Sequence, residues 1–128
     1  MTLTANSKKF LAIASFMMAL AIAIGAFGAH GLKALVSEQM LKVYNTGVQY
    51  HFYNTLGLFA AALIINFKTE SKKIIIACWL ILIGMIIFSF SLYALVILDM
   101  PILGAITPIG GTLLIIAWLL VTYSILKD

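Results

Sequence analysis

Most of the side chains that could bind a polar group lie in one short stretch of the chain. Gln49, Tyr50, His51, Tyr53, Asn54 and Thr55 fall within seven positions, directly before a long apolar run. Amides, phenols and imidazole form hydrogen bonds, and such groups are costly in apolar surroundings unless they are partnered. Tyr50, Asn54, Gly57 and Ala61 share one helical face, because they are spaced by four, three and four residues. The stretch therefore predicts a helix whose inward face carries Tyr50 and Asn54.

The two histidines and a nearby acid raise two kinds of chemistry. His30 with His51 could hold a metal ion, since imidazole suits Zn, Cu and Fe, but a closed site needs more ligands than the sequence offers near them. Ser89 or Ser91, with a histidine and Asp99, has the residue types for nucleophilic catalysis. Interfacial hydrogen bonds of the histidines and helix-to-helix hydrogen bonds of the serines explain the same residues more simply. We predict no catalytic residue, no metal site and no cofactor.

The segment after Asp99 has signals for a helix start and for a break in that helix. A proline two residues after Asp99 suits a first helical turn, and Asp99 is predicted to cap this helix, with a counter-ion or proton-relay role as the alternative. Thr107 then precedes Pro108, which lacks an N–H, and Gly110 and Gly111 weaken helix continuity. This break is either a packing kink, which we favour, or half of a broken-helix ligand site.

Composition predicts the elements that position these residues. Of the 128 residues, 64% are hydrophobic and 9% are charged, and the mean hydropathy is +1.16, whereas soluble domains are about 45–50% apolar. Four apolar blocks each reach the roughly 20 residues that cross a bilayer as a helix. The sequence predicts one all-α transmembrane domain over residues 1–128, an integral membrane bundle of four helices at about 10–30, 38–67, 74–98 and 102–126.

The lysines predict the topology, because positively charged loops stay on the cytoplasmic side. Lysine and arginine together number eight, all of them lysine, against four acids. Six lysines lie before the first helix, between the second and third, or after the fourth. Both termini are therefore predicted to be inside, in a multi-pass protein of the inner (cytoplasmic) membrane. Since no arginine is present to read bases, no nucleic-acid partner is predicted.

Small and amphipathic segments complete the predicted architecture. The first helix ends with three closely spaced glycines, Gly25, Gly28 and Gly31. Small residues recur at every fourth position from Ala21, which lets helix backbones approach closely, either inside the bundle or across a homodimer. Residues 32–44 carry apolar side chains at roughly helical spacing and predict a short interfacial amphipathic segment. Ser37 is the predicted N-cap of the second helix.

With this topology, the polar side chains fall mostly in the outer half of the membrane. Because polar groups in hydrocarbon face a bundle interior or a cavity, we predict one polar pocket that opens toward the outer leaflet. Its predicted lining is Gln49, Tyr50, His51, Tyr53, Asn54, Ser89, Ser91, Tyr93 and Thr107, with His30 and Asp99 as candidate polar partners. The glycines and Pro108, Gly110 and Gly111 are predicted to serve packing.

Four strings in order along the chain carry a family resemblance. They are GAFGAHGL at 25–32, TGVQYHFYNTLGL at 46–58, FSFSLYALVI at 88–97 and LGAITPIGGTLLIIAW at 103–118. The chain resembles, over essentially its whole length, the YgdD/YwdK-like family of small bacterial membrane proteins, a domain-of-unknown-function family. The resemblance implies four transmembrane helices in the inner membrane and no established activity. Glutamine is more usual in that family at position 51 and histidine at 54, which implies a hydrogen-bonding role here rather than a fixed histidine ligand.

These patterns lead to one functional hypothesis and two alternatives. The first is a non-enzymatic accessory or interaction subunit, or small homo-oligomer, whose pocket holds a lipid-like or quinone-like ligand. Its predicted partners are membrane lipids and either a second copy or a larger membrane complex. The alternative is an oligomeric transporter or channel for ions or small molecules, and a metal-dependent membrane enzyme is the third.

Overall fold

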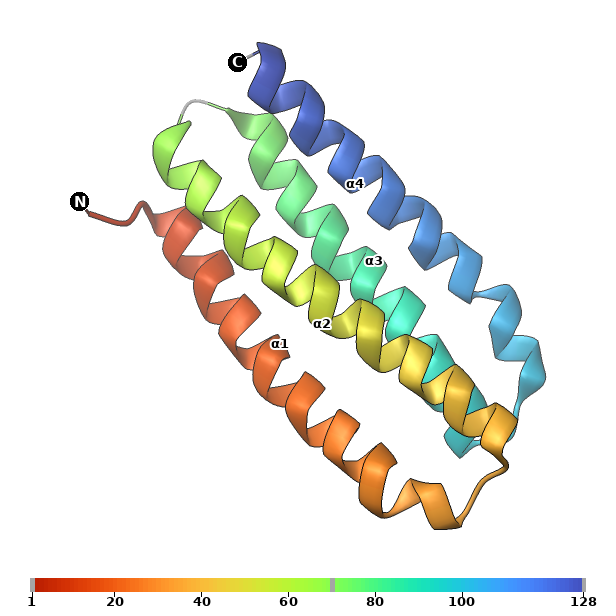
Figure 1. The fold of residues 1–128 in the computed structure, drawn as a ribbon. Coiled ribbons are helices and arrows are strands. Elements are labelled where there is room, and N and C mark those ends of the chain that lie inside the picture. Colours follow the sequence, from red (N-terminus) through yellow and green to blue (C-terminus); the bar gives the residue numbers. More distant parts are fainter. Residues whose placement is uncertain (1, 70, 128) are drawn as a thin grey trace.

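The computed structural model describes residues 2–69 and 71–127, and every secondary-structure element in those ranges is helical. Four long helices follow one another: α1 (Ala5–His30), α2 (Glu38–Phe67), α3 (Lys72–Ile97) and α4 (Thr107–Lys127). Two short 3-10 segments, η1 (Leu32–Ala34) and η2 (Pro101–Ala105), lie in connections at one end of the molecule (Figure 1). All four helices are long and apolar enough to cross a membrane, so the predicted all-α membrane bundle is confirmed.

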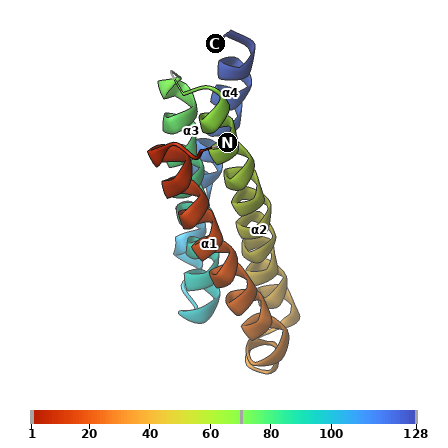
Figure 2. The same cartoon turned by 90° about the vertical axis from the view of Figure 1, so that its left-hand side faces the viewer.

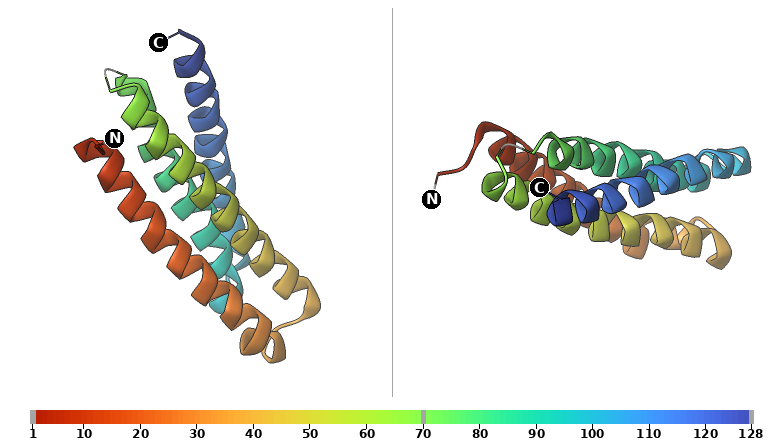
Figure 3. Two further views of the ribbon diagram at one scale, coloured as in Figure 1. Left: turned by 60° about the vertical axis from the view of Figure 1, so that its left-hand side comes forward. Right: turned by 90° about the horizontal axis from the view of Figure 1, so that it is seen from above.

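The second and third helices form the centre of the bundle. α2 packs along α3, α1 packs on α2, and α4 packs on α3, so α1 and α4 lie on opposite sides (Figure 1). Figures 2 and 3 show the same arrangement from other directions. The core runs from Phe10 and Ala14 of α1 through Leu58 and Ile81 to Ala117 of α4, all of them fully buried. Small core residues such as the alanines allow the close helix approach on which association in lipid depends.

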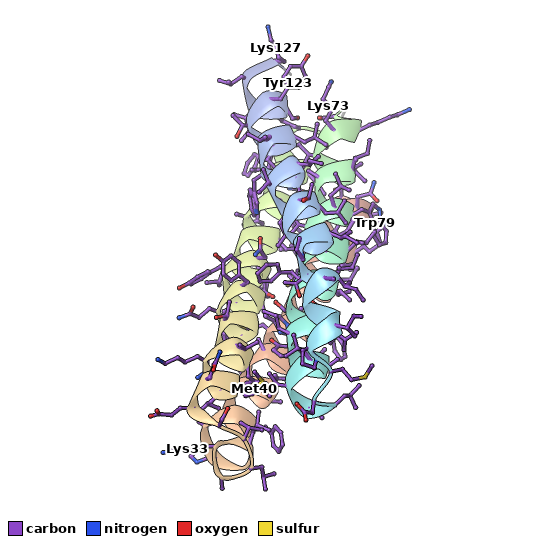
Figure 4. All side chains as sticks on the ribbon, turned by 90° about the vertical axis from the view of Figure 1, so that its right-hand side faces the viewer. Lys33, Met40, Lys73, Trp79, Tyr123 and Lys127 are labelled. Carbon is purple, nitrogen blue, oxygen red and sulfur yellow. The ribbon has the colours of Figure 1, made fainter. Side chains whose placement is uncertain are left out.

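Both chain ends lie at the same end of the bundle (Figure 1). Lys73 and Tyr123 mark this end, and Lys33 marks the opposite end (Figure 4). The ammonium of Lys9 lies 5.1 Å from the Trp79 ring centroid, a cation–π distance. Aromatic rings near lysines at a helix end are typical of a membrane–water interface.

Hydroxyl side chains cap the first two helices. The Ser37 hydroxyl accepts from the Met40 N–H at 3.2 Å, which confirms Ser37 as the N-cap of α2. The Thr4 hydroxyl accepts from the Ser7 N–H at 3.1 Å in the same way. The interfacial segment predicted between the first two helices is shorter than expected, because η1 has three residues and α2 already begins at Glu38.

Asp99 ends α3 and does not cap the following helix, so the predicted capping role is wrong. Its φ is 51°, and the N–H of Met100 donates to the Leu95 carbonyl at 3.0 Å. This is the Schellman pattern, in which the residue after the C-cap adopts the left-handed conformation. Aspartate is one of the few residues besides glycine that visit this conformation routinely. Met100 precedes η2 without a side-chain cap.

Pro108 lies in the first turn of α4 and does not kink a longer helix. The predicted helix from residue 102 is divided into η2 and α4, and α4 begins at Thr107. A missing N–H costs nothing in a first turn, where the donor has no intrahelical partner. Gly110 then allows α4 to approach α3, because a Cβ at this position would overlap the backbone of Phe88.

Candidate functional site

Three clusters of polar side chains between the helices include residues predicted for the pocket. In the first, the Tyr93 hydroxyl and His51 Nδ1 lie 2.9 Å apart, and both side chains are buried. Tyr93 occupies space left by Gly47, where a Cβ would come within 2.9 Å of the phenol ring. Tyr44 lies against Tyr93 at 5.2 Å between ring centroids and donates to the Ile24 carbonyl at 2.6 Å. This cluster therefore joins α1, α2 and α3.

His51 keeps one ring nitrogen without a well-formed hydrogen bond to residues 2–69 or 71–127. This nitrogen, Nε2, is buried, and the Met17 carbonyl of α1 faces the imidazole without reaching hydrogen-bond geometry. The Ser89 hydroxyl is likewise buried near Tyr93 but poorly aligned with it. If the Tyr93 hydroxyl donates to Nδ1, the imidazole carries its proton on Nε2, and this proton is directed toward the Met17 carbonyl. This tautomer leaves the fewest polar groups unpaired.

The second cluster joins α2 and α4. The Trp118 indole N–H donates to the Asn54 side-chain oxygen at 3.0 Å, and the Asn54 amide nitrogen donates to the Tyr50 carbonyl at 2.9 Å. An indole only donates, so its bond settles which end of the Asn54 amide carries the oxygen. The Trp118 ring lies in space left by Gly57, where a Cβ would overlap the indole. Asn54 is 7% exposed.

An open hollow of about 530 Å³ lies beside this pair and is called the α2–α4 groove below. Its walls include Tyr50 and Asn54 of α2, Phe88 of α3, and Leu114, Ile115 and Trp118 of α4. Tyr50 and Phe88 lie in contact, with ring centroids 4.7 Å apart. The groove is therefore mostly apolar and aromatic, with one buried amide in its wall.

The groove lies near the middle of the membrane-spanning length. Asn54 has roughly 20 Å of α2 on either side of it at about 1.5 Å per residue. Trp118, its partner, is close to the midpoint of α4. The lining also reaches Thr122, toward the end that carries the termini, so the groove is centred on the middle of the bundle. The opening toward the outer leaflet stays a prediction.

The third cluster joins the end of α3 to the start of α4. The Ser91 hydroxyl lies 2.6 Å from the Thr107 hydroxyl and donates to the Phe88 carbonyl at 2.9 Å. A serine hydroxyl has one proton to donate. Thr107 is therefore the donor between the two hydroxyls, and the pair fixes the first turn of α4 against α3.

The structure does not bring the predicted pocket residues together. Gln49, Tyr53 and His30 are exposed. The inward face of α2 carries His51 and Thr55, both fully buried, whereas Tyr50 is 42% exposed. The prediction that Tyr50 faces the bundle interior is therefore wrong, because the side of α2 that packs on α3 lies one residue further on. Tyr50 and Asn54 lie on the flank of α2 that faces α4.

The glycines predicted to serve packing differ in what they contact. Gly28 lies under Tyr44, where a Cβ would come within 2.5 Å of the ring. Gly25 faces Val48 of α2 at 3.3 Å, whereas Gly31 faces Phe27 of its own helix. Gly111 has only ordinary contact distances to the Phe88 ring.

The two histidines considered for metal binding lie apart, and Asp99 is not among the contacts of the buried histidine. Within the described chain, no group of three or more His, Cys, Asp or Glu side chains could hold a metal ion. His51 is buried in the bundle, whereas His30 is exposed at the end of α1. Asp99 is exposed and borders a hollow near Phe27 and Val96. Sequence reasoning did not identify Trp118 or Phe88 as site residues. The available signal was a pair of glycines on the facing helices: Gly57 leaves room for the Trp118 ring, and Gly110 packs against the Phe88 backbone.

Comparison with known proteins gives one consistent result. A model of the family described as "Protein of unknown function (DUF423)" matches residues 24–111. The chain is 41% identical over 120 residues to the UPF0382 membrane protein YwdK of Bacillus subtilis (strain 168), covering 94% of this chain and 98% of the relative. A UPF0382 membrane protein of Staphylococcus epidermidis is 40% identical (94% and 97% covered), and one of Haemophilus influenzae is 34% identical (94% and 95% covered). No solved structure matches the chain.

Proposed function

The chain belongs to the DUF423 family of proteins of unknown function, whose relatives are membrane proteins, and from this we propose a function that the membrane-embedded bundle itself performs. The protein is a non-enzymatic bundle whose α2–α4 groove holds the apolar part of a lipid-like or quinone-like molecule. The groove carries this proposal, because its volume of about 530 Å³ is in the usual range of ligand pockets, about 300–1,000 Å³. Such pockets combine apolar walls with a few placed polar groups.

The packing around the groove supports a site that exists before any ligand binds. The Trp118 ring is seated against Gly57, and its N–H is held by Asn54. Gly110 fixes the approach of α4 to α3, where a Cβ would overlap the backbone. Both walls are therefore positioned by contacts that do not involve a ligand, and little ordering cost remains for binding.

The location of the protein and its partners form part of the same proposal. We place it in the inner (cytoplasmic) membrane with both termini in the cytoplasm, because the end with the termini carries most of the lysines. In the most apolar 18-residue stretch of α1, 22% of the residues are buried, the smallest share among the four helices. This exposure supports a further partner on α1, either a second copy or a larger complex. Native mass spectrometry of the purified protein tests the partner, and a monomer without bound protein would contradict it.

The two tryptophans allow a direct test of the groove. In a Trp79→Phe variant, Trp118 is the one remaining indole, and it lies in the groove wall. Phospholipids brominated near the chain end quench indoles that contact the acyl chain at mid-bilayer. We expect strong, saturable quenching of Trp118 in bilayers that contain these lipids.

Two neighbouring isoleucines supply the variant and its matched control. Ile115 lines the groove and is 65% exposed, whereas Ile116 is 48% exposed and lies outside it. Ile115→Phe should fill part of the groove and reduce the quenching, and Ile116→Phe should leave it unchanged. Equal quenching in the two variants, or no saturation in the parent, would remove the groove as a binding site.

A further inference from the structure

The polar groups in the α2–α4 groove lead to a specific ligand chemistry. We propose, on the basis of the groove function proposed above, that the groove selects an uncharged carbonyl compound on an apolar chain, a quinone-like molecule. Asn54 and Tyr50 donate hydrogen bonds to its carbonyl oxygens. The two donors are the residues that discriminate this molecule from a plain acyl chain.

The hydrogen bonds already formed in the groove leave two donors available, one on Asn54 and one on Tyr50. The Trp118 N–H is used by the Asn54 oxygen, and the Thr122 hydroxyl donates to the Trp118 carbonyl at 3.0 Å. An amide nitrogen has two N–H groups, and the Tyr50 carbonyl takes one of those of Asn54. The Tyr50 hydroxyl makes no hydrogen bond to any described residue. The second N–H of Asn54 can be satisfied only by an acceptor, and the Tyr50 hydroxyl can donate to another, so a ligand with two acceptors would use both groups.

The position of the two donors suits a ring with two carbonyl groups. Tyr50 and Asn54 are four residues apart, so their Cβ atoms lie one helical turn, about 5–6 Å, from each other on the flank of α2 that faces α4. A para-quinone carries carbonyl oxygens on opposite edges of one flat ring. Phe88 and Trp118 supply aromatic walls against which such a ring can stack. The apolar chain then extends past Ile115 along α4.

The depth of Asn54 excludes the ester carbonyl of a phospholipid as the intended acceptor. Glycerol esters lie at the edges of the hydrocarbon core, which is about 30 Å thick. Asn54 has roughly 20 Å of helix on either side of it. An ester could reach Asn54 only by drawing a charged phosphate into the hydrocarbon, which is costly. An uncharged head can occupy this depth without that cost.

The test compares two probes that have the same chain. A benzoquinone with a ten-carbon alkyl chain and 1-bromodecane both quench indole fluorescence, but only the quinone has carbonyl groups. Each is titrated into the Trp79→Phe protein in phosphatidylcholine nanodiscs, where Trp118 reports occupancy. We expect saturable quenching by both probes, with the quinone binding about ten-fold or more tightly, since two hydrogen bonds of ordinary strength are gained.

Variants separate the carbonyl contacts from the apolar groove. Tyr50→Phe should weaken quinone binding about five-fold and leave bromodecane unchanged. Tyr53→Phe is the matched control, because Tyr53 is 61% exposed and lies outside the groove, and it should change neither probe. Asn54→Leu should weaken quinone binding about ten-fold. Circular dichroism of this variant reports whether it folds.

An infrared measurement tests the same contacts without any variant. The stretching frequency of a ¹³C-labelled quinone carbonyl falls when the oxygen accepts a hydrogen bond, so bound quinone should show a lowered band that free quinone in the membrane lacks. An unshifted band, or equal affinity for quinone and bromodecane, would overturn the carbonyl assignment while saturable bromodecane quenching keeps the groove. If neither probe saturates, the groove function fails and the carbonyl assignment fails with it.

Discussion

The Trp118 indole N–H donates to the Asn54 side-chain oxygen at 3.0 Å, although the two residues are 64 positions apart. α2 packs mainly on α1 and α3, and α4 packs mainly on α3. The bond therefore crosses a space that backbone packing leaves open between α2 and α4. The groove is the part of this space that the indole does not fill.

A double-mutant cycle measures the worth of this bond. Asn54→Leu and Trp118→Phe each remove one partner, and we expect a coupling free energy of about 0.6 kcal/mol and at most about 1.7 kcal/mol, the mean and the maximum for hydrogen bonds between membrane helices. Unfolding in a denaturing detergent, followed by circular dichroism, measures it. Asn54→Leu with Trp79→Phe is the control pair, which should be additive within about 0.5 kcal/mol. A coupling near zero in the first pair would contradict the bond.

Two adjacent glycines of α4 should respond to the same substitution in opposite ways. Gly110→Ala places a Cβ into the backbone of Phe88, so we expect a loss of about 1–3 kcal/mol in the free energy of unfolding. Gly111→Ala meets only the Phe88 ring at 3.6 Å and should be neutral or stabilising by up to about 1 kcal/mol. Detergent unfolding of both proteins measures the difference, and similar values would show that Gly110 does not set the helix spacing.

The end of α3 should tolerate glycine better than a branched residue. Asp99 has a φ of 51°, so Asp99→Gly should retain stability or raise it by up to about 1 kcal/mol. Asp99→Val should lower it, because a β-branched residue is strained in this conformation. Asp99→Asn removes the charge but tolerates the same backbone, and it separates the two effects. If glycine proves as harmful as valine, the carboxylate has a role beyond the turn.

The His51 and Tyr93 pair should be non-additive. Tyr93→Phe leaves a buried ring nitrogen without its partner, which costs about 1–3 kcal/mol. His51→Leu together with Tyr93→Phe removes both polar groups, so the double variant should lose less than the sum of the single losses. Tyr123→Phe, at an exposed site, should change stability by less than about 0.5 kcal/mol. Additive losses would mean that the two side chains act independently.

The sequence determined the class of the fold and the bounds of α2. Hydrophobic blocks of membrane-spanning length are a local property, as is a serine that caps a helix, and both are readable from one chain. The predicted span at 38–67 coincides with α2, and Ser37 caps it. The predicted N-cap at Asp99 was wrong, and the predicted break lies before Pro108 rather than at it, because packing decided where α3 ends and where α4 begins.

Only the tertiary structure decided which side chains meet. Sequence reasoning assigned eleven polar side chains to one membrane region, but helix rotation by one residue moves a side chain about 100° around the axis. That rotation buried His51 against Tyr93, turned Tyr50 toward α4 and divided the predicted pocket into three clusters. Trp118 reaches Asn54 because Gly57 has no side chain, and that contact depends on the spacing of two helices that are not neighbours in the sequence.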